Sequence, residues 1–252
     1  MNVHVGTSGW AYDDWRHGLF HGVPQRVWFE TVVGEFGTVE LNVTFYRLPA
    51  ESVFAGWRRR APDGAVIAVK ASRYLTHVRR LAEPQQPVAR LLARAERLEA
   101  VLGPVLLQLP PDMAVDVDAL DTTLACFAQR VRVAVEPRHG SWWTPGVRRT
   151  LERHDAALVW ADRRGPITPF WQTASWCYLR FHEGRAGPWP RYGRRAIDTW
   201  AARIAALDGD PDVFAYFNND QGGAAVADAV ALRERLRRHR LTVVAGPTSR
   251  LS

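Results

Sequence analysis

Residues 65–72 read AVIAVKAS, a run of five apolar residues that leads directly into Lys70. A short apolar run of this kind predicts a buried β-strand. Lys70 is the only lysine in the chain, and every other basic residue counted with it is an arginine. Lysine can lose its proton, form an imine or act as a compact point charge, which arginine cannot do. The stretch therefore predicts a strand that ends in a chemically distinctive residue; the alternative is a single lysine that escaped a codon bias.

Similar apolar runs recur along the whole chain. The other predicted strands are Val3–Thr7, Thr38–Asn42, Val105–Leu109, Val131–Glu136, Ala157–Asp162, Cys177–His182 and Val213–Asn218. Their mean spacing is about 30 residues, the size of one strand-plus-helix unit.

Most gaps between these runs carry apolar residues at helical spacing. The predicted helices are Gln25–Phe36, Val88–Leu102, Asp118–Phe127, Pro145–His154, Arg195–Leu207 and Ala224–Arg238. Over residues 163–176 a loop or a short helix is expected instead. Strands that alternate with helices favour a parallel sheet, and eight such units in 252 residues predict a single (β/α)8 TIM-type barrel domain over residues 1–252. An open, doubly wound α/β sheet is the alternative.

Composition narrows the class of protein. The net charge of +7 suggests anionic partners, but many arginines fall near predicted helix ends or on exposed helix faces, where they complement helix dipoles. Cys126 and Cys177 give neither a metal-binding spacing nor a disulfide framework. The first predicted strand leaves no room for a signal peptide, and no apolar run approaches the roughly 18 residues of a membrane span. A cytoplasmic protein without a membrane partner is expected.

Strand parity predicts where the polar residues point. Side chains of barrel strands alternate between the axis and the helices, and the apolar positions near each strand end assign the outward face. Polar residues then close almost every strand on the inward side: Glu40, Asn42, Lys70, Gln108, Glu136, Arg138, Asp162, Arg180, His182 and Asn218. Barrel enzymes keep their sites at this carboxyl-terminal mouth, so a polar site is predicted there.

The charges in this set allow three interpretations. They could form a closed ion-pair network that only satisfies itself, since buried charges must be paired. They could bind a divalent ion, for which the suitable ligand types are Glu40, Glu136, Asp162 and His182. Three cations in the same set, Lys70, Arg138 and Arg180, already balance the carboxylates, so neither a metal nor another cofactor is expected.

The third interpretation is a metal-free site for an anionic or polyhydroxyl ligand. Arginines would clamp a carboxylate or phosphate, a glutamate would act as general base, and the histidine as acid or base. Lys70 would stabilise developing negative charge or attack a carbonyl to form an imine. The expected catalytic residues are Lys70, Glu40, Glu136, Asp162 and His182.

Two loops extend the predicted mouth. Residues 6–15, GTSGWAYDDW, combine glycines, hydroxyls and aromatic side chains. Residues 184–195, GRAGPWPRYGRR, combine arginines with Trp189 and Tyr192, a pairing that grips phosphates and stacks on bases or sugars. A mobile arginine-rich loop is the alternative for the second one. His139, close after Glu136, is also within the expected reach of the site.

The assembled blocks resemble the YecE-like proteins, domain-of-unknown-function family 72. The blocks that carry the resemblance, in the family's order, are GTSGWAYDDW (6–15), FGTVELNVTFYRLP (36–49), AVKASRYLTH (68–77), LGPVLLQLPP (102–111), VAVEPRHGSW (133–142), YLRFH (178–182) and AYFNND (215–220). The resemblance implies a (β/α)8 barrel without a settled reaction, although some members have been likened to endonuclease IV-type barrels. The polar residues it implies by position are Thr7, Ser8, Trp10, Tyr12, Trp15, Glu40, Asn42, Thr44, Tyr46, Lys70, His77, Gln108, Glu136, Arg138, Trp142, Arg180, His182, Asn218 and Asn219.

Together these patterns predict an enzyme, hydrolase-like or lyase-like, that acts on an anionic substrate such as nucleic acid or a phosphosugar. An imine-forming lyase using Lys70 and a non-catalytic binding module for an anionic or sugar-like ligand are the alternatives. The expected substrate-binding residues are Thr7, Trp10, Tyr12, Trp15, Asn42, Tyr46, Gln108, Arg138, Trp142, Arg180, Asn218 and Asn219.

Overall fold

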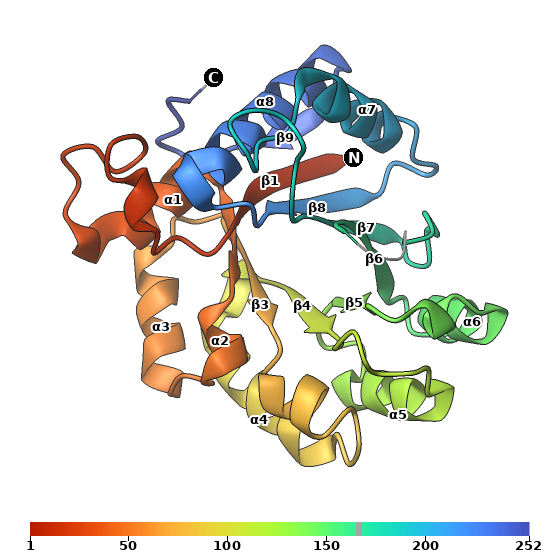
Figure 1. Ribbon diagram of the computed structural model, residues 1–252. Helices are drawn as coiled ribbons and strands as arrows, with labels where there is room; N and C mark the ends of the chain where they lie inside the picture. The colour runs from red at the N-terminus through yellow and green to blue at the C-terminus, as the bar shows by residue number, and fades with distance from the viewer. Residues whose placement is uncertain (165–167, 252) are drawn as a thin grey trace. The chain divides into compact units, whose positions relative to one another are not determined.

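The computed structural model describes residues 1–164 and 168–251, and its strands form one parallel sheet (Figure 1). The strands are β1 (Asn2–Ser8), β2 (Thr38–Leu41), β3 (Val66–Lys70), β4 (Leu102–Gln108), β5 (Val133–Glu136), β6 (Ala157–Asp162), β7 (Trp176–Phe181), β8 (Asp212–Phe217) and β9 (Thr242–Val244). Their order is β2-β3-β4-β5-β6-β7-β8-β1-β9, and β1 also pairs with β2. That pairing closes an eight-stranded barrel, so the predicted (β/α)8 fold is confirmed.

Helices separate the strands. They are α1 (Trp28–Phe36), α2 (Val43–Tyr46), α3 (Glu51–Arg60), α4 (Gln85–Ala95), α5 (Val117–Phe127), α6 (Pro145–Arg153), α7 (Arg194–Ala205) and α8 (Ala224–Arg238). Short turns of other helical types are η1 (Asp13–Trp15), η2 (Gln25–Val27), η3 (Tyr74–Val78), η4 (Glu96–Val101), η5 (Gly140–Trp142) and η6 (Gln221–Gly223).

The predicted helices are present, with several shifted boundaries. The helix expected from Gln25 starts as the 3-10 turn η2 before α1 begins at Trp28, and α4 ends at Ala95 where the 3-10 segment η4 follows. The helix expected over Val88–Leu102 begins earlier, at Gln85, and Leu102 already belongs to β4. Over residues 163–176 the described part contains no helix before β7 begins at Trp176, and residues 165–167 lie outside the described residues. Helix α3 and strand β9 were not predicted.

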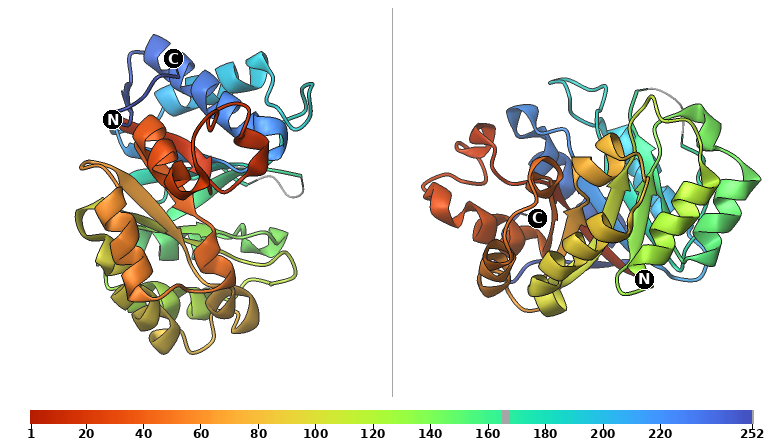
Figure 2. Two further views of the ribbon diagram at one scale, coloured as in Figure 1. Left: turned by 90° about the vertical axis from the view of Figure 1, so that its left-hand side faces the viewer. Right: turned by 90° about the horizontal axis from the view of Figure 1, so that it is seen from below.

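The chain divides into two compact units, each described here by itself. Unit 1 comprises residues 1–40, 60–66 and 179–252, and unit 2 comprises residues 41–59 and 67–178. In unit 1, β1 lies between β8 and β9, while α7 and α8 pack together and α8 also packs on β1 (Figure 1). In unit 2, β4 and β5 pair in register, and α5 lies between α4 and α6 (Figure 2).

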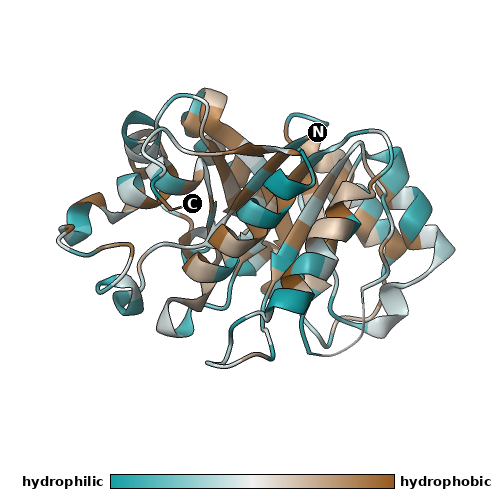
Figure 3. Cartoon of the chain, turned by 90° about the horizontal axis from the view of Figure 1, so that it is seen from above, coloured by the Kyte–Doolittle hydropathy of each residue, from teal (hydrophilic) through white to brown (hydrophobic). Residues whose placement is uncertain are grey.

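Local sequence explains these elements. The strands are built from apolar runs and are drawn largely in brown, whereas the helices carry hydrophilic residues on part of their surface (Figure 3). Helix α5 begins where the Asp116 side chain accepts a hydrogen bond from the Ala119 backbone N–H at 2.9 Å. Helix α6 begins with Thr144 as cap and Pro145 in its first turn, where a missing N–H costs nothing.

Gly6 allows a close approach of β1 to β2. A Cβ atom at this position would lie 2.6 Å from the backbone oxygen of Thr38, too close for any other residue without a shift of one strand. Because the pairing of β1 with β2 closes the barrel, a larger residue here would disturb that closure. Among the described residues, no helix has the length and apolarity of a membrane span.

Candidate functional site

A buried ion pair occupies the carboxyl ends of β1, β2 and β7 in unit 1. Arg180 Nη2 donates to Glu40 Oε1 at 2.9 Å and contacts Ser8 Oγ at 3.2 Å. Ser8 Oγ donates to the same carboxylate oxygen of Glu40. The side chains of Glu40 and Arg180 are 0% and 1% exposed, so their opposite charges offset each other away from solvent. Two residues predicted from strand parity are thus brought together.

Asp220 follows β8 in unit 1 after Asn218 and Asn219, and its carboxyl is perturbed by burial. Among the described residues, its buried Oδ1 atom has no hydrogen-bond partner. Burial raises the pKa of this carboxyl to about 7, and the charge of Glu40 adds to the increase, while a hydrogen bond from Tyr12 and the charge of Arg180 oppose it. A carboxyl with this pKa exchanges a proton readily near neutral pH.

Asp220 was not among the site residues predicted from the sequence. It follows the predicted Asn218 and Asn219 and closes the block AYFNND, which was the one available signal. The hydroxyl of Tyr12, which was predicted, lies 2.7 Å from the Ser8 backbone oxygen. Because it has one proton, it donates to this oxygen or to Asp220 at any one time. Gly9 adopts φ +94°, and a Cβ atom there would lie 2.8 Å from the Tyr12 hydroxyl, so the glycine keeps this position open.

His182 and Asn218 form a second predicted pair in unit 1. Asn218 Nδ2 lies 3.1 Å from His182 Nδ1. Since the amide nitrogen can only donate, Nδ1 acts as acceptor and the neutral imidazole carries its proton on Nε2. The pair therefore fixes the tautomer of a histidine at the end of β7.

The loop over residues 184–193 is held by Asp228 of α8. This fully buried carboxylate accepts hydrogen bonds from Arg191 Nε at 2.9 Å, the Tyr192 backbone N–H at 2.9 Å and Asn219 Nδ2 at 2.8 Å. Asn219, predicted to bind substrate, is one of the groups that anchor this loop. Asp228 was missed because it lies within the alanine-rich helical pattern of α8.

In unit 2, Lys70 ends β3 and lies over an aromatic ring. Lys70 is 9% exposed, and its Nζ atom lies 4.2 Å from the ring centroid of Phe45. Thr44 Oγ1 donates to the Lys70 backbone oxygen at 2.6 Å, which ties α2 to the end of β3. The aromatic ring stabilises the charged ammonium form of the lysine.

His77 lies in a locally positive environment in unit 2. Burial lowers its pKa, and the charges of Lys70, Arg73 and Arg138 lower it further, with only Asp112 acting in the opposite direction. Its ring nitrogens contact Thr76 Oγ1 at 2.9 Å and the predicted Gln108 at 3.5 Å. The imidazole is therefore neutral at pH 7, and the surrounding potential attracts anions.

Glu136 and Arg138 form the corresponding ion pair of unit 2. Arg138 Nη2 lies 3.1 Å from Glu136 Oε1, and Arg163 Nη2 donates to the Arg138 backbone oxygen at 3.2 Å. Burial and the charge of Arg138 lower the pKa of Arg163. Asp162 lies half-buried at the end of β6.

Three of the predicted substrate-binding residues are buried and make contacts within the protein. Trp15 is buried and packs on the rings of Tyr12 and Phe20. Trp142 is fully buried and its Nε1 donates to the Met113 backbone oxygen at 2.8 Å. Thr7 is also fully buried, and its hydroxyl donates to the Gly9 backbone oxygen.

Three others are more accessible. Trp10 is half-buried, with its ring in edge contact with Phe29. Asn42 is half-buried where α2 begins. Tyr46, at the end of α2, is 81% exposed.

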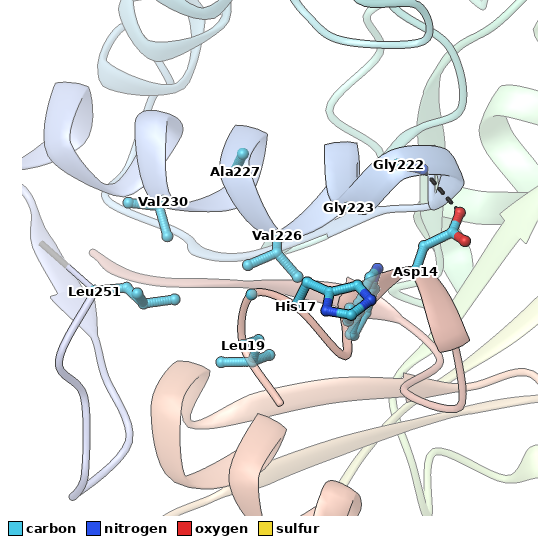
Figure 4. A pocket seen from close by; sticks show the side chains of 11 residues that line it. Asp14, His17, Leu19, Gly222, Gly223, Val226, Ala227, Val230 and Leu251 are labelled. Carbon is cyan, nitrogen blue, oxygen red and sulfur yellow. Dashed lines mark hydrogen bonds between the residues drawn. The ribbon is translucent and has the colours of Figure 1, made fainter. Parts of the chain in front are cut away.

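An apolar pocket of about 550 Å³ lies in unit 1, between the segment around η1 and helix α8 (Figure 4). Its wall includes Leu19, Val226 and Val230, and Asp14 at its rim accepts a hydrogen bond from the Gly222 backbone N–H at 2.8 Å. Of the predicted site residues, only Trp15 lines this pocket. Within the described ranges 1–164 and 168–251, no group of three or more His, Cys, Asp or Glu could hold a metal ion.

Comparison with known proteins gives one family. The family model described as protein of unknown function DUF72 matches residues 4–251. A DUF72 family protein of Thermotoga maritima is 25% identical, with a TM-score of 0.79 over 94% of this chain and 100% of that chain. A DUF72 family protein of Enterococcus faecalis is 18% identical, with a TM-score of 0.80 over 99% of this chain and 100% of that one.

A more distant structure, SacUVDE, shares the fold alone. It is 7% identical, with a TM-score of 0.52 over 94% of this chain and 98% of that chain. The search of curated proteins found no match.

Proposed function

The chain belongs to the DUF72 family, and we propose that it is an enzyme, hydrolase-like or lyase-like, that acts on an anionic substrate such as a nucleic acid or a phosphosugar. The observation that carries the proposal is Asp220, whose pKa of about 7 and unbonded buried oxygen suit a general acid–base. Strong pKa perturbation of a carboxyl at the carboxyl ends of barrel strands favours a catalytic role.

The anionic class of substrate is supported by unit 2. The cations that lower the pKa of His77 create a positive potential around Lys70. Lysine acts there as a compact point charge, suited to a phosphate or to negative charge that develops during the reaction. A carboxylate group of a substrate would meet the same requirement.

Asp220 would act in both halves of a hydrolytic or eliminating step. As a carboxylate it removes a proton from water or from a substrate carbon, and as a carboxylic acid it returns the proton to the leaving oxygen. Glu40 and Arg180 would position and tune it, because their opposite charges act on its pKa in opposite directions. His182, with its tautomer fixed by Asn218, is the second proposed proton-transfer group.

Two alternatives from the sequence have less support. An imine requires a neutral amine, whereas the contact of Lys70 with Phe45 stabilises the ammonium form. A non-catalytic binding module does not need a carboxyl tuned to neutral pH. A cytoplasmic location and a single-domain organisation stay predictions of the sequence.

The experiment is a turnover screen with one matched control. Phosphodiesters, abasic DNA and sugar phosphates are incubated with wild type, Asp220→Asn and Asp210→Asn, the last being the same change at an exposed aspartate. We expect a substrate that wild type and Asp210→Asn convert, and for which Asp220→Asn loses about a hundredfold or more in kcat. Tight binding of a panel member without turnover by wild type would favour the binding module, and full activity of Asp220→Asn would remove Asp220 from the reaction.

A further inference from the structure

A small aromatic pocket opens on the surface of unit 2 beside Lys70. It has a volume of about 200 Å³ and is lined by Phe45 and Tyr46 of α2, Tyr74 of η3, and Gln86 and Arg90 of α4. Pockets for drug-sized ligands usually measure about 300–1,000 Å³, so this one suits a single planar ring system.

The two tyrosines are unusually accessible. Tyr46 is 81% exposed and Tyr74 is 53% exposed. Neither ring contributes much to the core, yet the backbone beneath Tyr46 is firmly held, because Arg94 donates to the Leu48 and Pro49 backbone oxygens at 2.7 and 2.8 Å. Rigid, accessible aromatic rings around a pocket favour stacking with a flat ligand.

The exposed arginines of unit 2 differ in whether they pair with a carboxylate. Arg79, Arg80 and Arg97 each pair with a carboxylate, namely Glu83, Asp112 and Glu51. Arg90, which lines the pocket, has no such ion pair within the part of the chain that the structure describes. The same holds for two exposed arginines next in sequence to lining residues, Arg47 after Tyr46 and Arg73 before Tyr74. Their charges are thus available to an anionic ligand.

The pocket is continuous with the Lys70 region. Phe45 both lines the pocket and contacts the Lys70 ammonium, and Ser72, two residues after Lys70, also lines it. A ligand stacked in the pocket therefore lies next to the positive potential around His77.

We propose that this pocket binds an unpaired base of single-stranded nucleic acid, an inference that rests on the proposed function and names its substrate class. The base stacks against Tyr46 and Tyr74, with Gln86 available to its polar edge, and the three arginines contact the phosphates. Bases within a duplex have both faces covered, so an aromatic platform of this kind selects unpaired ones. The sugar-phosphate chain then continues toward Lys70.

Fluorescence anisotropy tests the proposal with a labelled single-stranded oligonucleotide, the same sequence as a duplex, and the corresponding mononucleotide. We expect Tyr46→Ala and Tyr74→Ala each to weaken binding of the single strand about tenfold, whereas Tyr46→Phe and Tyr74→Phe, which keep the ring, stay within about twofold of wild type. Arg90→Gln should reduce the dependence of affinity on salt. All these side chains are exposed, and thermal unfolding checks that each variant folds as the wild type does.

Three results would overturn the proposal: equal affinity for the duplex, equal affinity for the mononucleotide, which would indicate a free-nucleotide site, or unchanged single-strand binding by both alanine variants. Asp220→Asn separates the two claims. If the wild type turns over no panel substrate, while Asp220→Asn and the wild type bind the oligonucleotide equally well, the proposed reaction fails and the base pocket stands. If the tyrosine variants lose neither binding nor turnover of a nucleic-acid substrate, the base pocket alone fails.

Discussion

Asp220 shows how burial beside an ion pair can bring the pKa of a carboxyl near neutral pH. Glu40 raises its pKa and Arg180 lowers it, so the two members of the buried ion pair act on this carboxyl in opposite directions. Burial makes the largest contribution and raises the pKa of Asp220, and the hydrogen bond with Tyr12 lowers it in part. Removing either charge of the pair would therefore shift the pKa of Asp220.

The raised pKa of Asp220 predicts a pH-dependent effect on stability. The carboxyl ordinarily titrates at 3.8 and in the folded chain at about 7. A pKa raised by folding contributes stability that is fully present below 3.8 and is lost as the pH rises through 7. Asparagine cannot ionise, so Asp220→Asn should unfold with a free energy close to that of wild type at pH 4 and about 4 kcal/mol higher at pH 9.

Chemical denaturation at both pH values measures this difference, with Asp210→Asn as the control in which no such change with pH is expected. A difference between wild type and Asp220→Asn that is the same at pH 4 and pH 9 would show that Asp220 is not buried as a neutral group.

At the scale of elements, α8 organises the loop over residues 184–193. Its Asp228 binds one backbone N–H and two side chains from different segments. We therefore predict that Asp228→Ala releases the loop and makes the peptide bonds after Arg185 and Arg191 more sensitive to trypsin by about tenfold, since proteolysis follows local opening.

Limited proteolysis of the folded protein checks the prediction, again beside Asp210→Asn. Unchanged cleavage in this loop would mean that the packing of Tyr192 on Phe181 and Phe217 is sufficient to hold it.

The elements that could be predicted are those with a strong apolar pattern. Each of the eight predicted strands is present because its apolar run is buried in the sheet. Helix α3 was missed because its only buried residues are Phe54 and Trp57, and it ends in three arginines. Strand β9 spans three residues and pairs with β1, a contact between the two ends of the chain that no local pattern contains.

At the scale of the whole molecule, the sequence could place polar residues at strand ends but could not choose their partners. Parity indicated Glu40 and Arg180, yet their pairing joins residues 140 positions apart. The pKa of Asp220 depends in part on Tyr12, which lies near the opposite end of the sequence. Burial of a specific carboxyl oxygen is a three-dimensional property, so the proposed acid–base could not have been identified from spacing alone.

The net charge of the whole molecule likewise could not locate a binding site. The net charge of +7 suggested an anionic partner only weakly, because many arginines pair on the surface, as Arg60 does with Glu30 and Arg153 with Asp121. What distinguishes the pocket in unit 2 is the combination of two exposed tyrosines with Arg90, which has no ion pair among the described residues.

The measurement that tests the account most directly is the pKa of Asp220 itself, because the proposed proton transfer depends on it and no substrate is needed. Carbon-13 NMR of protein labelled at the aspartate carboxyls, titrated with pH for wild type and for Asp220→Asn, identifies its signal by difference. The account predicts one aspartate that titrates at about 7 and is missing from the variant. An Asp220 signal that titrates near its ordinary value of 3.8 would contradict it.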